Sequence, residues 1–283
     1  MVVTFGYKQR NSLVETFDPR ARWIFSILSL FTIVNFWDIR FLLYFLLVSV
    51  VQYSFTRLTW KETKRAWRFI FFLMFIMIFV NTIVTSAGTI SDVSANPHVL
   101  FAIEKPIRFT MTIERLWFAL TQMVRVLSIT MLFIVVPFTM DPRQYGITFK
   151  GMGLGDKLAF TMDLAFRFVP TLARDFGTTM DAQKARGYEL DNLKGNIFKK
   201  IARMAPIMIP VTMNSLLSGE DMVNAMDLRG FSTSGKRTWL YTLKYRKRDI
   251  ALIAYSVVVL IISIILPRVF HIGGFWVPPF LIP

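Results

Sequence analysis

The sequence has 283 residues, 54% of them hydrophobic, with 28 phenylalanines, no cysteine and a formal net charge of +15. The apolar content indicates a membrane protein with several spans, and the lack of cysteine excludes disulfides and thiolate metal sites. Because the basic residues flank apolar segments instead of forming a basic domain, the charge favours anionic membrane lipid or acidic protein partners over nucleic acid.

Five apolar segments are predicted to be transmembrane helices: Ala21–Trp37, Phe41–Phe55, Phe69–Ser86, Leu116–Phe138 and Ile250–Leu266. A hydrocarbon core takes about 20 helical residues, so the first two segments must borrow flanking residues or thin the bilayer. Between them, Asp38 and Arg40 leave room only for a hairpin turn, and Pro267 is expected to end the fifth helix. Two further apolar segments, at 158–168 and 201–217, could dip into the membrane, which leaves the span count open.

Lysine and arginine are unevenly distributed between these segments. Residues 1–22 carry four, loop 56–68 five and loop 87–115 three, while segment 139–249 carries 18 against 11 acidic residues. Positively charged loops stay cytoplasmic, which places the N-terminus and segment 139–249 in the cytoplasm and the tail 270–283 outside. We therefore predict an all-α polytopic membrane protein with about five transmembrane helices. Its parts are a transmembrane bundle (1–138), a cytoplasmic or interfacial coupling domain (139–249) and a last transmembrane helix with a short tail (250–283).

Segment 139–249 is predicted to contain two amphipathic helices, from about Pro170 to Arg186 and from about Val211 to Arg229. Pro170 and Pro210 are expected near the first turns, where proline is tolerated. Between the helices, residues 193–204 carry four basic side chains that would face lipid headgroups or a partner.

The two helices end in nearly the same sequence, 43 residues apart: Ala185-Arg186-Gly187 before Tyr188, and Leu228-Arg229-Gly230 before Phe231. In each, arginine favours the negative end of the helix dipole and glycine provides a left-handed cap. One such ending is ordinary helix chemistry, but two aligned endings favour a docking role. An arginine at a helix tip can enter a groove on a soluble partner and bind a carboxylate through both arms of its guanidinium.

Three blocks of the sequence resemble the transmembrane T component (EcfT/CbiQ-like) of energy-coupling factor (ECF) transporters, the vitamin and transition-metal importers of prokaryotes. The blocks are Asp18-Pro19-Arg20, the stretch from Phe166 to Gly187, and Ala225–Phe231, in order along nearly the whole chain. The resemblance implies a multi-pass protein of the prokaryotic inner membrane that docks onto two ATPase subunits, the same or different. The implied coupling residues are Ala185, Arg186, Gly187, Leu228, Arg229 and Gly230. Leu228 departs from the family pattern, in which alanine is more common.

The leading hypothesis is a non-catalytic scaffold that transmits ATP-driven movement to a membrane-embedded substrate-binding S component. The chain itself is expected to bind no cofactor, because ATP and Mg²⁺ would lie on the partner ATPases. A conventional ABC importer permease that forms its own solute path as a dimer would need one docking motif per chain, and the duplication argues against it. A lipid-modifying enzyme should show clustered His, Asp or Glu near span ends, which this sequence lacks.

Several other features are weak candidates for sites. Residues 230–237 nearly spell a phosphate-binding loop, but Arg237 stands where Ser or Thr should hold Mg²⁺. His98 and His271 lie far apart, so no metal site is predicted, and Gly151–Gly155 is typical of a turn.

Three charged positions have local interpretations. Arg125 lies inside the fourth span, where a charge either serves function or pairs with a carbonyl or acid of another span. Asp163 and Arg167 are expected to form an ion pair along one helix. Asp18 is expected to be the N-cap of the first helix, with Pro19 at its first position.

Overall fold

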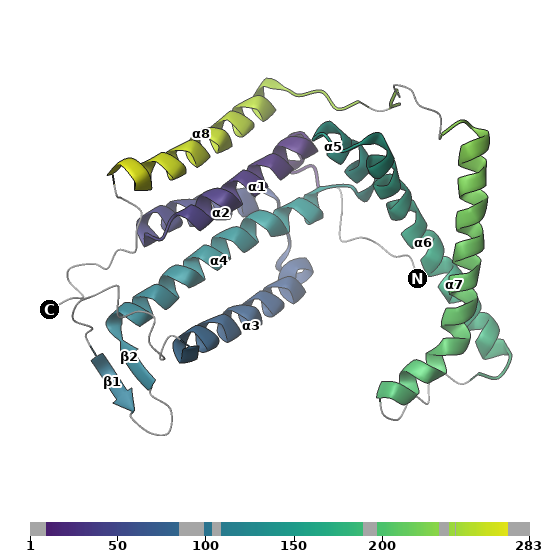
Figure 1. Ribbon diagram of the computed structural model, residues 1–283, viewed down its shortest axis with the longest axis horizontal. Coiled ribbons are helices and arrows are strands. Elements are labelled where there is room, and N and C mark those ends of the chain that lie inside the picture. Colours follow the sequence, from purple (N-terminus) through teal and green to yellow (C-terminus); the bar gives the residue numbers. More distant parts are fainter. Residues whose placement is uncertain are drawn as a thin grey trace. The chain divides into compact units, whose positions relative to one another are not determined.

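The computed structural model describes residues 10–84, 99–103, 109–188, 197–231, 238–240 and 242–270 (Figure 1). They form two compact units. The first, which we call the bundle, lies within Gly6–Asp141 and Lys244–Pro283, and the second, the helix-pair unit, lies within Pro142–Leu243. The chain therefore leaves the bundle after Asp141 and returns to it at Lys244.

The described part of the bundle is mostly helical. A 3-10 turn at Val14–Thr16 precedes the helices α1 (Pro19–Asn35), α2 (Ile39–Phe55), α3 (Trp60–Val84), α4 (Ile113–Thr139) and α8 (Lys247–Phe270). Strands β1 (Val99–Ile103) and β2 (Phe109–Thr112) pair antiparallel just before α4. The helical class is as predicted, whereas this hairpin was not foreseen in loop 87–115.

The helices of the bundle lie side by side, with α1 against α4 and α8, and α4 against α2 and α3 (Figure 1). Their shared core is built from the buried side chains of Phe25, Ile33, Phe36, Leu42, Phe45, Val124 and Leu132. Small polar groups bond across the helices: Ser49 donates to the carbonyl of Ser128 at 3.1 Å, and the Asn35 amide donates to Ser263 Oγ at 3.3 Å. Such contacts hold helices together where lipid removes the hydrophobic drive for association.

Among the described residues, two helices are long and apolar enough to cross a membrane, over Leu116–Thr139 and Lys247–Val269, and Ile39–Phe55 is a shorter apolar helix. These match the fourth, fifth and second predicted spans, while the total of five stays a prediction. The short connection between α1 and α2 is the predicted hairpin turn, and Asp38 caps α2.

Two predicted boundaries in the bundle were wrong. Helix α3 begins at Trp60, so most of the predicted loop 56–68 is helical. Helix α8 continues through Pro267 to Phe270. A proline removes one backbone donor, and an apolar helix in a membrane tolerates that loss when its flanks continue the same pattern.

The helix-pair unit contains a 3-10 turn at Pro142–Gln144, then α5 (Tyr145–Gly151), α6 (Asp156–Ala185) and α7 (Ile197–Leu228). Both long helices begin well before the predicted starts, so Pro170 lies inside α6, and Pro206 and Pro210 lie inside α7. The amphipathic faces extend through these prolines, which cost a backbone hydrogen bond without ending the helix. Gly153, with φ +105°, makes the predicted turn between α5 and α6. Of the basic stretch 193–204, residues 197–204 begin α7 and the rest lie outside the described residues.

Candidate functional site

The end of α6 is a complete Schellman motif. The amide of Tyr188 donates to the carbonyl of Gln183 at 3.0 Å, and the amide of Gly187 donates to the carbonyl of Lys184 at 2.9 Å. This pair of bonds requires a left-handed residue at the position of Gly187, whose φ is +83°. Arg186 is the C-cap between the last helical residue and the glycine.

The end of α7 has the same geometry. The amide of Phe231 donates to the carbonyl of Met226, and the amide of Gly230 donates to the carbonyl of Asp227, both at 2.9 Å. Gly230 has a φ of +68°, and Arg229 takes the position that Arg186 holds on α6. The predicted left-handed caps are therefore confirmed, and the sequence repeat is also a repeat in backbone structure.

Both arginines are exposed, as are Ala185 and Leu228, and Leu228 shows 90% of its surface. Within the part of the chain that the structure describes, neither guanidinium makes a side-chain hydrogen bond or an ion pair. A large apolar side chain and a cation, both facing solvent beside a rigid cap, are typical of a surface that another protein covers.

The two tips lie at opposite ends of an antiparallel helix pair. Three contacts step in opposite directions along α6 and α7: Gln183–Pro206 at 3.3 Å, Asp175–Asn214 at 3.5 Å, and the rings of Phe160 and Phe231 at 4.6 Å. At 1.5 Å of rise per residue, helices of this length separate Arg186 from Arg229 by roughly 40 Å. Each tip can therefore meet its own partner.

The end of α7 is fixed further by the segment that follows it. The indole Nε1 of Trp239 donates to Asp156 Oδ1 at 2.9 Å, at the start of α6, and Lys150 forms an ion pair with the same oxygen at 2.6 Å. Together with the Phe160–Phe231 ring contact, these bonds hold the Arg229 tip against the first turn of α6. The tip is thereby presented on a supported backbone.

The sequence model of the cobalt transport protein family, CbiQ, matches residues 11–239. The chain belongs to this family. It is 37% identical over 110 residues to the energy-coupling factor transporter transmembrane protein EcfT of Lactococcus lactis subsp. cremoris (strain MG1363), a match that covers 39% of this chain and 40% of that protein. It is 26% identical to the EcfT proteins of Staphylococcus aureus (strain 04-02981), over 92% of this chain and 95% of the relative, and of Clostridium kluyveri (strain ATCC 8527), over 93% and 96%.

The matches differ in extent. The chain spans less than half the length of the Lactococcus relative in that alignment, but nearly the whole length of the other two. These relatives are transmembrane proteins by name, and α4 and α8 have the length and composition of membrane spans. This member of the CbiQ family is therefore a membrane protein.

In this CbiQ-family chain, Arg125 pairs with a backbone carbonyl in the connection between α1 and α2. Pairing with a carbonyl of another span was one of the two roles expected for this charge. Its Nη2 lies 2.5 Å from the carbonyl oxygen of Phe36, in the turn between α1 and α2, and its guanidinium lies over the Trp37 ring at 4.5 Å. Gln122 accepts a longer bond from Nη1 at 3.4 Å. These contacts give the charge a structural role in joining α4 to the α1–α2 turn.

The remaining candidates from the sequence are local or lie outside the described residues. Arg167 and Asp163 form the expected ion pair at 3.2 Å. No cluster of three or more potential metal ligands occurs among the described residues. His98, His271 and residues 232–237 of the near phosphate loop lie outside them.

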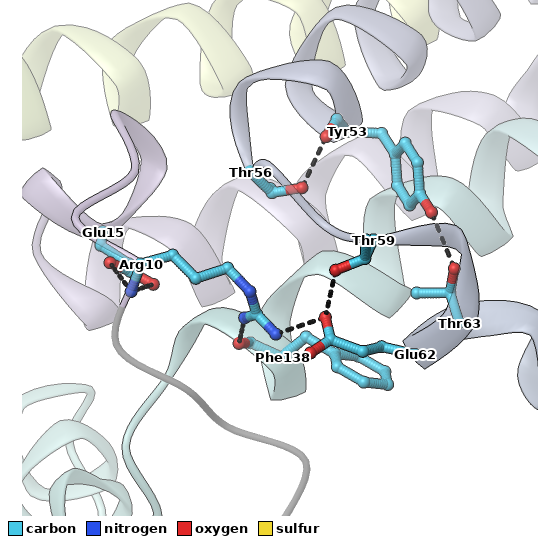
Figure 2. A network of polar contacts seen from close by, with 8 residues as sticks. All are labelled: Arg10, Glu15, Tyr53, Thr56, Thr59, Glu62, Thr63 and Phe138. Carbon is cyan, nitrogen blue, oxygen red and sulfur yellow. Dashed lines mark hydrogen bonds and ion pairs between the residues drawn. The ribbon is translucent and has the colours of Figure 1, made fainter.

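A polar network at the end of α4 has no signal in the sequence (Figure 2). Arg10 Nη1 donates to the carbonyl of Phe138 at 3.1 Å, while its Nη2 forms an ion pair with Glu62 at 2.7 Å. Thr59 also donates to Glu62, at 3.1 Å. The last carbonyls of a helix lack partners within it and attract cations, so Arg10 caps α4 from a distant part of the chain. In the sequence, Arg10 signalled only the orientation of the N-terminus.

Asp18 caps α1 as predicted, with Pro19 at the first position, and accepts from the Arg20 amide at 2.9 Å. The same carboxylate binds the Arg20 guanidinium at 2.9 Å. In addition, the backbone amide of Asp18 donates to Asp249 Oδ1 at 2.9 Å, which joins the start of α1 to the start of α8. The Asp18-Pro19-Arg20 block thus has a tertiary role besides helix entry.

Proposed function

We propose that the chain is the transmembrane scaffold of an ECF-type ABC importer. In this role it transmits ATP-driven movement of two ATPase subunits to a substrate-capturing membrane S component. The observation that carries the proposal is the pair of matching, exposed Arg-Gly tips at opposite ends of α6 and α7. Membership of the CbiQ family and similarity to EcfT proteins support it.

Each tip has the chemistry to dock onto an acidic groove. A guanidinium presents donors in a rigid fork that matches a carboxylate, and burial in a groove strengthens the pair by excluding water. The Schellman cap holds the arginine at the end of a stiff rod, so that force on the tip moves the whole helix. Ala185 or Leu228 then provides the apolar contact next to the charge.

The proposed division of labour assigns ATP hydrolysis to the partners. The two ATPases, identical or different, hold ATP and Mg²⁺, and their closure moves the two tips relative to one another. The helix pair passes that movement to the S component, which captures a vitamin or a transition-metal ion. The chain contributes mechanical coupling and no catalytic step.

A conventional permease that forms its own solute path as a dimer is the alternative. In such a dimer each chain supplies one docking point, and symmetry supplies the second. Two equivalent tips on one chain, roughly 40 Å apart, already match two partners. This geometry favours the scaffold.

Co-purification tests the proposal. The affinity-tagged chain, expressed with the ATPase and S-component genes of its own organism, should bring down two ATPase chains and one small membrane protein per copy. A complex with two copies of this chain and no S component would overturn the scaffold in favour of the permease.

A further inference from the structure

The chain passes between the bundle and the helix-pair unit twice, after Asp141 and before Lys244. On the bundle side, one short segment near the N-terminus, residues 10–23, contacts the chain at both crossings. The sequence places this segment more than a hundred residues from either crossing. Its contacts are therefore part of the tertiary structure of the bundle.

At the first crossing, the last two residues of α4 and the residue after it accept hydrogen bonds from this segment: the Phe138 carbonyl from Arg10 at 3.1 Å, the Thr139 carbonyl from Arg22 at 2.9 Å and Met140 Sδ from Trp23 at 3.3 Å. Arg22 also donates to Thr139 Oγ1 at 3.0 Å. Arg22 and Thr139 are almost fully buried, at 5% and 2% exposed, so water competes weakly for these bonds.

At the second crossing, Asp249 accepts hydrogen bonds from two backbone amides on the bundle side of the junction. Its Oδ1 accepts from the amide of Asp18 at 2.9 Å, and its Oδ2 accepts from the amide of Arg246 at 2.8 Å. The guanidinium of Arg20 lies over the ring of Tyr245, 3.9 Å from its centroid. Asp249 is 1% exposed and Asp18 is 7% exposed, so losing this carboxylate would leave the buried amide of Asp18 without its partner.

We propose that residues 10–23 form a clasp that fixes both crossings to the bundle. The positioning residues are Arg22 within the clasp and Asp249, the α8 residue that the clasp binds. The inference rests on the proposed function and deepens it. Because both crossings are fixed, a movement of the helix-pair unit is transmitted to α1, α4 and α8, the helices that contain the clasp or the residues it binds. If the crossings were flexible, the two connections would bend locally and the movement would not reach these helices.

The chain contains a matched control for the chemistry of the clasp. Asp38 caps α2 and binds Arg40 with the same geometry as Asp18 and Arg20, from the backbone amide at 3.0 Å and the guanidinium at 2.6 Å. Asp38 is 1% exposed, as Asp249 is, but the structure gives it no bond to either crossing. Asp38→Asn therefore weakens a buried carboxylate cap of the bundle without touching the clasp.

The test measures distances between the two units in the isolated chain. Because the chain has no cysteine, nitroxide labels can be placed at Arg174→Cys on α6 and Leu43→Cys on α2, both exposed, and followed by pulsed electron paramagnetic resonance. The clasp predicts that the distance distribution is broader in the Arg22→Met/Asp249→Asn variant than in the parent chain, and that it is unchanged in Asp38→Asn. An unchanged distribution in the double variant, or equal broadening in the control, overturns the clasp.

If the double variant does not fold, Arg10→Gln carries the test, since Arg10 is only partly buried and its loss leaves the second crossing intact. It should broaden the distribution without shifting the thermal unfolding midpoint beyond the shift seen in Asp38→Asn. A midpoint shift with a distribution as narrow as in the parent chain would assign Arg10 a purely structural role and overturn the proposal. The measurement needs no partner, so its failure is distinguishable from failed ATPase co-purification.

Discussion

The side-chain amide of Gln183 donates a hydrogen bond to the backbone carbonyl of Pro206, at 3.3 Å. In a regular helix that carbonyl would accept from the residue four positions later, which here is Pro210 and has no N–H. The last turn of α6 therefore supplies the donor that a proline removes from α7. Through this bond, the tip that carries Arg186 is attached to the first half of α7.

This relationship predicts a non-additive pair of substitutions. Gln183→Ala should lower the free energy of unfolding by about 0.5–1.5 kcal/mol, because the Pro206 carbonyl loses its donor. In a Pro210→Ala background the new backbone amide takes over the carbonyl, and the same change should cost much less. Thermal unfolding of the four variants in detergent measures the coupling. Equal costs of Gln183→Ala in both backgrounds would show that the bond does not replace the helical one.

The tips predict a specific loss of docking. Arg186→Ala and Arg229→Ala should each weaken ATPase binding by roughly 2–5 kcal/mol where the partner carboxylate is buried, because it is left without its cation. Lysine at either position should restore part of the affinity, since it keeps the charge and loses the fork. The measurement is the dissociation constant of the purified chain for its ATPases.

Arg174→Ala is the control for these substitutions, since it removes an exposed arginine from the interior of the same helix α6. Its affinity should equal that of the parent chain. Retention of full complex yield by the Arg186→Ala/Arg229→Ala variant would remove the tips from the docking surface.

Alanine substitutions at two glycines, one at the cap of α6 and one inside the helix, should change the free energy of unfolding in opposite directions. Gly187→Ala should destabilise the chain by about 1–2 kcal/mol, because its φ of +83° is strained for any residue with a Cβ. No atom lies within 4 Å of the Cβ that would be added, so backbone strain is the whole cost. Gly177→Ala, also with open space but inside α6, should stabilise by roughly 0.5–1 kcal/mol. If thermal unfolding showed that both substitutions stabilise the chain, or that both destabilise it, the left-handed cap would be contradicted.

Arg125 predicts a loss of stability without a loss of docking. Arg125→Met removes the donor to the Phe36 carbonyl and the stacking on Trp37, which should cost about 1.5–3 kcal/mol. Lysine should recover less than half of this, because it cannot stack as a plane. Unfolding midpoints measure the cost, and ATPase co-purification of the folded fraction should stay normal. A stable variant with lost transport would instead make Arg125 a functional charge.

The sequence predicted what depends on local rules. Apolar length located α4 and α8, and the pattern Arg-Gly-aromatic located both caps, because a Schellman motif is formed by six consecutive residues. The predicted starts of α6 and α7 were wrong because they were placed at prolines. A proline changes one hydrogen bond, whereas the amphipathic pattern that continues on both sides of Pro170 and Pro210 decides whether the helix persists.

Non-local contacts escaped the sequence analysis. Arg22 and Thr139 are 117 residues apart, and Asp18 and Asp249 are 231 apart, so no periodicity relates them. The antiparallel arrangement of α6 and α7 was likewise invisible, because it depends on pairs such as Phe160 and Phe231 that only the folded chain brings together. The sequence identified the two tips but not that they point away from each other.

An antiparallel pair of helices has a local dyad perpendicular to both axes, and here it exchanges Arg186 with Arg229. A single asymmetric chain thereby displays approximate two-fold symmetry at its surface, which is the symmetry that a dimer of ATPases would present. Ala185 and Leu228 are exchanged by the same rotation and differ in size. That difference distinguishes the two docking tips, so two different ATPase subunits would bind in one defined arrangement.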